Sequence, residues 1–129
     1  MALKIILASV FVADQHKALE FYTETLGFVK KEDVPVGNFR WLTVVAADDQ
    51  HGTELLLEPN DNPVAKAYQQ GIFDQGIPAA SFGVTDIHAE FEKLDRRGVK
   101  FTMEPTKMGQ VTVAIFEDTC GNLIQLMQK

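Results

Sequence analysis

The chain has 129 residues, of which 46% are hydrophobic and 23% charged. This composition is ordinary for a soluble globular protein and excludes a disordered chain. The net charge of −6 argues against a nucleic-acid surface and against binding to an anionic membrane. Cys120 is the only cysteine, so an intrachain disulfide is excluded, and the N-terminus shows no signal-peptide pattern. We therefore expect a cytoplasmic protein with a reduced thiol.

The first predicted elements are a strand and a helix. The apolar segment 9–13 ends at Asp14, whose carboxylate suits the N-cap of a helix. The helix carries an apolar stripe and ends at Gly27, a residue suited to the left-handed position after a helix. Three strands are predicted to follow, at Phe28–Glu32, Phe39–Ala46 and Thr53–Glu58.

The same order of elements returns after a linker with a short helix at 64–70. A strand at 81–84 leads to Asp86, 72 positions after Asp14, and a second helix ends at Gly98. Strands are predicted at Lys100–Met103, Val111–Phe116 and Leu123–Gln128. A repeat of strand, Asp cap, helix and Gly stop indicates an internal duplication.

The predicted fold class is α+β. We expect two βαβββ modules at residues 1–60 and 79–129, joined by the linker 61–78. Each module alone is too small to close its own core, so curved mixed sheets should enclose a shared cavity, with the helices outside.

Three segments carry a family pattern: VADQHKALEFYTETLGF (residues 12–28), GTELLLEP (52–59) and FEDTCGNLIQLMQ (116–128). They resemble the vicinal oxygen chelate superfamily, which includes glyoxalase I, bleomycin-resistance proteins and extradiol dioxygenases. The resemblance covers nearly the whole chain except the linker. It implies the duplicated fold, a small-molecule ligand and a homodimer, because members commonly build their cavities from modules of two chains.

Metal-dependent members of this superfamily take four ligands from four strands, two from each module. The resemblance places the matching positions at Leu7, Glu54, Ala79 and Gln125. Leu7 and Ala79 have no donor atom, so we expect no metal cofactor. Glu54 and Gln125 are the residual candidates for a weakly held Mg²⁺ or Mn²⁺ ion.

Glu54 is the candidate catalytic residue. Strand alternation puts Glu54 and Leu56 on one face, and a lone carboxylate in an apolar strand must be solvated, paired or functional. Glu54 is either a general base or a family relic that is hydrogen-bonded to Gln125 or water.

Trp41 and Arg40 are candidates for stacking and charge against a flat ligand. The alternative is a core Trp41 and a surface Arg40 in a salt bridge. The predicted pocket gathers six residues: Leu7, Arg40, Trp41, Glu54, Ala79 and Gln125.

The histidines and the cysteine are given plain structural roles. His16 and His88 fall in the first turn of each predicted helix, and His51 falls in a hairpin loop. We expect all three to be exposed rather than to bind metal. Cys120 lies in a turn beside acidic residues, which predicts an exposed and unactivated thiol.

Two functions remain open. The first is a metal-free binding protein of the glyoxalase and bleomycin-resistance type, which holds an apolar or aromatic small molecule; the acidic charge suits a cationic ligand. The alternative is a lyase, isomerase or dioxygenase that depends on a metal or on Glu54. The missing donors at Leu7 and Ala79 favour the first function, and Glu54 alone supports the second.

Overall fold

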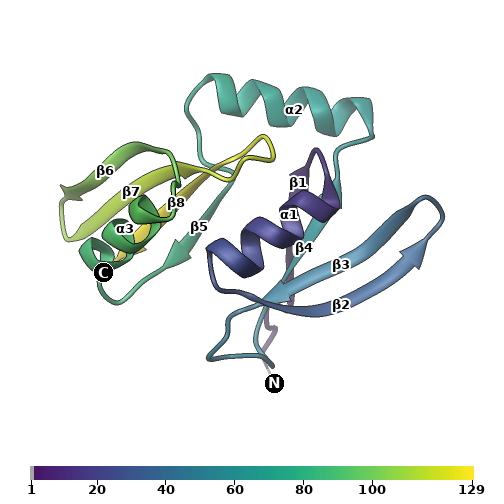
Figure 1. The fold of residues 1–129 in the computed structure, drawn as a ribbon, viewed down its shortest axis with the longest axis horizontal. Helices are drawn as coiled ribbons and strands as arrows, with labels where there is room; N and C mark the ends of the chain where they lie inside the picture. The colour runs from purple at the N-terminus through teal and green to yellow at the C-terminus, as the bar shows by residue number, and fades with distance from the viewer. Residues whose placement is uncertain (1) are drawn as a thin grey trace. The chain divides into compact units, whose positions relative to one another are not determined.

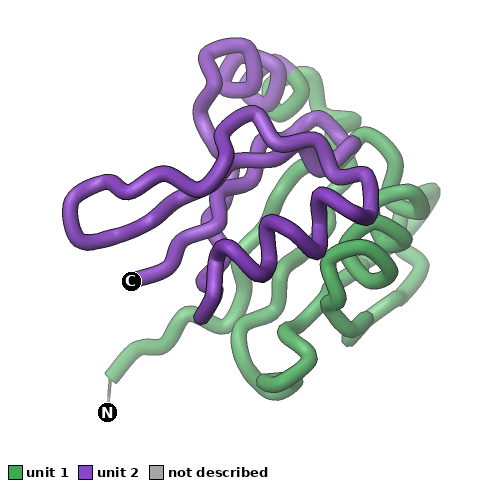
Figure 2. The backbone as a smooth tube through the Cα atoms, turned by 60° about the vertical axis from the view of Figure 1, so that its left-hand side comes forward, with its two compact units in different colours: residues 1–66 green, residues 67–129 purple. Residues whose placement is uncertain are grey.

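The structure is a computed structural model that describes residues 2–129. The chain divides into two compact units, at residues 1–66 and 67–129 (Figure 2). The boundary falls inside helix α2 (Pro63–Asp74), which is longer than the predicted linker helix. The linker is therefore mostly helical.

The first unit contains one four-stranded mixed sheet and one helical segment (Figure 1). Strand β1 (Leu7–Val12) pairs in parallel with β4 (Glu54–Pro59), and β3 (Phe39–Val45) and β2 (Val29–Val36) follow in antiparallel order. Helix α1 (Gln15–Glu20) continues directly into a π-helical turn, η1 (Phe21–Thr25).

The second unit repeats this arrangement. Its sheet has the order β5 (Ala80–Gly83), β8 (Leu123–Gln128), β7 (Val111–Glu117) and β6 (Phe101–Met108), with β5 parallel to β8. Helix α3 (Ile87–Arg96) follows β5, as α1 follows β1. The predicted α+β class with two βαβββ modules is confirmed.

Helix capping explains why both helices begin where the sequence predicts. The carboxylate of Asp14 accepts a hydrogen bond from the N–H of Lys17, and that of Asp86 accepts one from Ala89, both at 3.1 Å. Each bond satisfies one of the free N–H groups of a first helical turn. Gly27 and Gly98 follow the helices with positive φ angles of 91° and 84°, as the sequence predicts.

Strands β2 and β6 are longer than predicted because each continues up to a two-residue hairpin. Gly37-Asn38 joins β2 to β3, and Gly109-Gln110 joins β6 to β7. Both glycines have positive φ angles, 59° and 66°, which suits the twist of a two-residue hairpin. The charged residues of β2 obscure its strand pattern, although such residues are common on edge strands.

One face of each sheet packs against the helix of its own unit. In the first unit the buried residues of this face include Val10, Leu42 and Leu57, with Ala18 and Tyr22 from the helical segment. In the second unit the rings of Phe91, Phe101 and Phe116 form a continuous series, accompanied by Ile87, Leu94, Ala114, Ile124 and Leu126. We call the opposite face of each sheet its free face. No helix among the described residues is long and apolar enough to cross a membrane.

Candidate functional site

The free face of the first sheet carries the main candidate site. Strand pairing puts Leu7 beside Glu54, and Thr43 beside Leu56. Because side chains alternate along a strand, Trp41 shares this face with Thr43. Three of the predicted site residues, Leu7, Trp41 and Glu54, are thus brought onto one surface, and Glu54 and Leu56 share a face as predicted.

Glu54 is half-buried and held by one neighbour. Its Oε1 accepts a hydrogen bond from the hydroxyl of Thr43 at 2.7 Å. The same hydroxyl oxygen accepts from the backbone N–H of Glu32 at 3.1 Å, so its proton is directed to Glu54. Within residues 2–129, no protein donor bonds to Oε2 of Glu54. This second oxygen is available to accept a hydrogen bond from a ligand.

Trp41 belongs to an exposed apolar stripe. It is 43% exposed, so the alternative that placed it in the core was wrong. Val34 pairs with Trp41 across the β2–β3 hairpin, and Val36 pairs with Phe39. These four exposed residues are called the hairpin stripe. The stripe gives the carboxylate of Glu54 an apolar surface on the same side of the sheet.

Arg40 lies on the opposite face from Trp41, because the two residues are adjacent in β3. Its guanidinium makes a two-pronged ion pair with Asp33, at 3.0 Å from Nε to Oδ1 and 2.7 Å from Nη2 to Oδ2. The hydrogen bonds from Arg40 lower the pKa of Asp33, and those to Asp33 raise the pKa of Arg40. The salt-bridge alternative is therefore correct. Arg40 and Trp41 therefore lie on opposite faces of β3, and the structure does not bring them together on one surface.

The second unit arranges its predicted residues differently. Gln125 pairs with Ser81, and its Nε2 donates to the Ser81 hydroxyl oxygen at 3.0 Å. Ala79 precedes β5, and its N–H donates to the carbonyl of Leu123 at 2.8 Å. Leu7 and Glu54 are direct neighbours, whereas Gln125 is paired two residues beyond Ala79. Counting along the chain from the helix caps therefore missed the register of this strand pair.

The donor set does not fit a metal site of the family type. The side chains of Leu7 and Ala79 offer no lone pair, Glu54 supplies a single carboxylate, and Gln125 supplies only the neutral oxygen of an amide whose nitrogen donates to Ser81. Over residues 2–129, no group of three or more His, Cys, Asp or Glu side chains is placed to hold an ion. A catalytic divalent site usually needs three protein ligands.

The histidines are exposed, as predicted. His16 bonds to Glu20 at 2.9 Å on the surface of α1, and His51 and His88 are also exposed.

Cys120 is buried, which corrects the expectation of an exposed thiol. It belongs to a tightly bonded loop between β7 and β8. The buried carboxylate of Asp118 accepts from the N–H groups of Cys120 and Asn122, at 2.8 and 3.0 Å, and from the side-chain amide of Asn122 at 2.8 Å. Gln69 of α2 donates to the carbonyl of Cys120 at 3.1 Å. The sequence shows a turn here, but only the packing of α2 buries it.

The comparisons with known proteins agree with this architecture. The model of the Glyoxalase/Bleomycin resistance protein/Dioxygenase superfamily matches residues 4–126. The chain belongs to this superfamily.

Relatives of this superfamily member include both uncharacterized proteins and enzymes. It is 65% identical over 127 residues to the protein YurT of Bacillus subtilis, covering 98% of this chain and 100% of the relative. It is 31% identical over 121 residues to a probable lactoylglutathione lyase of Synechocystis, covering 91% and 88%.

Among solved structures, UcmS2 matches with a TM-score of 0.84 and 32% identity, covering 98% of each chain. TnmS3, an antibiotic binding protein from Streptomyces sp. CB03234, matches with a TM-score of 0.76 and 30% identity, covering 99% of this chain and 98% of that one.

Proposed function

We propose that this superfamily member is a metal-free binding protein for an apolar or aromatic small molecule that carries a cationic or hydrogen-bond-donating group. The observation that carries the proposal is the free Oε2 of Glu54 on the same face as the exposed hairpin stripe. A cytoplasmic location, inferred from the single cysteine, is part of the same proposal.

The spacing of the two features sets the shape of the ligand. Trp41 stands two residues before Thr43, whose hydroxyl bonds to Glu54, and two strand residues span about 7 Å. A flat ring stacked on Trp41 would place an attached amine or hydroxyl within reach of the carboxylate. Stacking on an aromatic side chain contributes about 1 kcal/mol beyond the buried area, and a hydrogen bond to a charged group about 2 kcal/mol.

Charge and kinship both support this ligand class. The net charge of −6 raises the local concentration of cations around the chain. TnmS3, which shares the fold at 30% identity, is an antibiotic binding protein. An amine-bearing aromatic antibiotic is therefore the first ligand class to test.

The second candidate function is a lyase, isomerase or dioxygenase that depends on a metal or on Glu54 as a general base. It is favoured by the similarity to a probable lactoylglutathione lyase of Synechocystis and to a lactoylglutathione lyase of Neisseria meningitidis. Elemental analysis separates the binding protein from the metal-dependent form of this enzyme. We expect protein purified without added metal to carry well under one equivalent of Zn, Ni, Fe or Mn. If the purified protein carried a stoichiometric metal and Glu54→Gln lost it, the enzyme function would be supported and the metal-free binding function contradicted.

A thermal-shift screen of amine-bearing aromatic antibiotics, followed by titration, tests the binding function. Trp41 is the only tryptophan, so quenching of its fluorescence reports binding at the stripe. For a ligand found in this way, we expect Glu54→Gln to weaken affinity about tenfold, or about 1.4 kcal/mol, with the melting temperature retained. Trp41→Ala should weaken the affinity for this ligand at least as much. Because this variant lacks the tryptophan, its affinity is measured by calorimetry.

His88→Ala is the control variant because His88 is exposed on α3. Cys120→Ser does not serve as a control, since Cys120 is buried. Equal affinities of the wild type, Glu54→Gln and Trp41→Ala would contradict the proposed site.

A further inference from the structure

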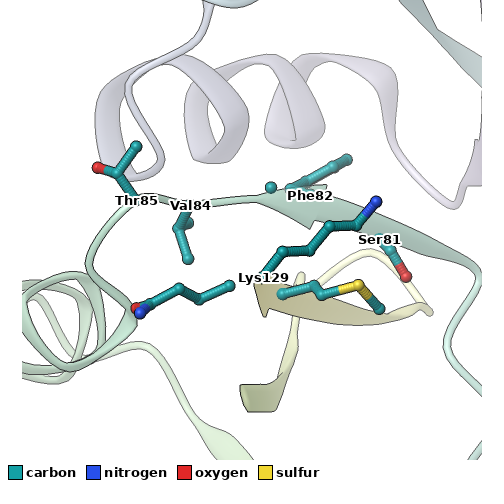
Figure 3. A pocket seen from close by; sticks show the side chains of 8 residues that line it. Ser81, Phe82, Val84, Thr85 and Lys129 are labelled. Atoms are coloured by element: carbon teal, nitrogen blue, oxygen red, sulfur yellow. The ribbon is translucent and has the colours of Figure 1, made fainter. Parts of the chain in front are cut away.

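A separate pocket lies in the second unit, at the end of the parallel pair β5 and β8 (Figure 3). Its volume is about 620 Å³, which is within the range of small-molecule sites. The lining combines the apolar side chains of Phe82, Val84 and Met127 with the polar side chains of Ser81 and Lys129. Neither Glu54 nor the hairpin stripe contributes to it.

The polar side of this pocket offers hydrogen-bond donors. The Ser81 oxygen accepts from Nε2 of Gln125 at 3.0 Å, so the hydroxyl proton of Ser81 is free to point elsewhere. Gln128 accepts the backbone N–H of Ile87 at 2.7 Å through its Oε1, which leaves its amide N–H groups as donors. The hydrogen bonds inside the unit thus occupy acceptors and leave donors for a ligand.

Lys129 supplies the only charged side chain of the lining. Its side chain crosses the space between the ends of β5 and β8, and its nitrogen lies on the side of Ser81 and Phe82 (Figure 3). Within residues 2–129, no Asp or Glu side chain forms an ion pair with it. An ammonium group that no Asp or Glu side chain neutralises, beside a hydroxyl donor, attracts an anion.

We propose that this pocket is a second binding site, which takes a small carboxylate with an apolar or aromatic body. The carboxylate is held by the Lys129 ammonium and the Ser81 hydroxyl, and the body rests on Met127, which lies on the same face of the sheet as Ser81. A thioether adapts its shape to a flat ring and contacts it favourably. This site has the opposite charge preference to the Glu54 site and is independent of it.

Two matched probes test the charge preference. Benzoate and benzamide have the same ring and nearly the same shape, but only benzoate is an anion. Titration with benzoate is followed in ¹⁵N–¹H correlation spectra. We expect saturable shifts of the backbone signals of Gly83, Thr85 and Lys129, with a millimolar dissociation constant. Benzamide should bind at least about fivefold more weakly, because an ion-paired hydrogen bond is worth about 1 kcal/mol more than a neutral one.

Three variants locate the charge. Lys129→Met should weaken benzoate binding about fivefold or more, and Lys129→Arg should retain it. Ser81→Ala should weaken it about threefold, through the loss of one donor. Lys107→Met is the matched control, since Lys107 is exposed on β6 and does not line the pocket.

Four outcomes would overturn the proposal: no saturable shift at these residues, equal affinity for benzamide, unchanged affinity in Lys129→Met, or an equal loss in Lys107→Met. The indole N–H signal of Trp41 should stay in place throughout. A shift of that signal without the pocket signals would assign benzoate to the hairpin stripe and also overturn the proposal. Failure here leaves the fluorescence test of the Glu54 site unaffected.

Discussion

The two units share one architecture and differ on the faces that the helices leave free. In the first unit a carboxylate, Glu54, is held by Thr43 beside an exposed apolar stripe. In the second, a neutral amide, Gln125, bonds to Ser81, and Lys129 lines the same pocket as Ser81. The helix-packed faces and the Asp caps are alike in both units. A duplicated fold thus keeps the residues that build each module, while its free faces diverge in charge.

The loops between the last two strands show a second difference. In the first unit, residues 47–51 are exposed. In the second, Asp118 and Cys120 are buried and Gln69 of α2 bonds to their loop. The same position in the repeat is therefore a surface loop in one unit and part of the core in the other.

The largest expected effect concerns the oligomeric state of the protein in solution. Among the described residues, each sheet ends on one side in a mostly exposed edge strand, β2 in one unit and β6 in the other. Exposed strand edges are commonly covered by another chain, and we propose a homodimer. Light scattering at micromolar concentration should give twice the mass of the chain, whereas a monomer would contradict the proposal.

The loop comparison predicts the largest effect of a single substitution. Asp118→Ala leaves three N–H groups of a buried loop without their acceptor, which should cost about 3 kcal/mol of unfolding free energy. Asp48→Ala, in the exposed loop of the first unit, should change it by less than about 0.5 kcal/mol. Urea unfolding measures both variants. Similar losses of unfolding free energy in Asp118→Ala and Asp48→Ala would contradict the view that only the loop of the second unit stabilises the core.

The free faces predict a smaller contrast in stability. Thr43→Val conserves volume but leaves the Glu32 N–H and the Glu54 carboxylate without the hydroxyl between them. We expect a loss of about 1–2 kcal/mol. Ser81→Ala removes an exposed hydroxyl and should cost less than about 0.5 kcal/mol. Thermal unfolding, monitored by circular dichroism, measures the stability of both variants. A larger loss of stability for Ser81→Ala than for Thr43→Val would contradict this prediction.

The smallest predicted effect depends on pH. Arg40 lowers the pKa of Asp33 in the folded protein, so the unfolded chain takes up a proton first as the pH falls. The stabilisation is present above the ordinary pKa of about 4 and is lost as the pH falls through the lowered value. Because the pair is solvent-accessible, it contributes less than about 1 kcal/mol.

Asp33→Asn should therefore flatten the fall in unfolding free energy below about pH 4. Glu117→Gln removes the longer Lys100–Glu117 pair of the second unit, at 3.5 Å, and should lower the stability at pH 7 by less than Asp33→Asn does. Urea unfolding at several pH values measures both. An unchanged acid profile in Asp33→Asn would contradict the assigned cause.

The sequence by itself determined the two βαβββ modules and where the helix that follows the first strand of each begins. Asp14, Asp86, Gly27 and Gly98 act on the nearest turn of the chain, so their roles depend on local geometry. Alternation within β4 likewise placed Glu54 and Leu56 on one face. Gly37 and Gly109 carry an equally local signal for the two hairpins.

Only the tertiary structure decided which residues distant in the chain bond to one another. Thr43 reaches Glu54 across a strand pair, and Gln69 reaches the Asp118 loop from a helix 51 residues before Cys120. Strand register likewise set Gln125 beside Ser81 rather than Ala79. These contacts join residues far apart in the chain. They depend on how sheets pair and helices pack, which no local pattern encodes.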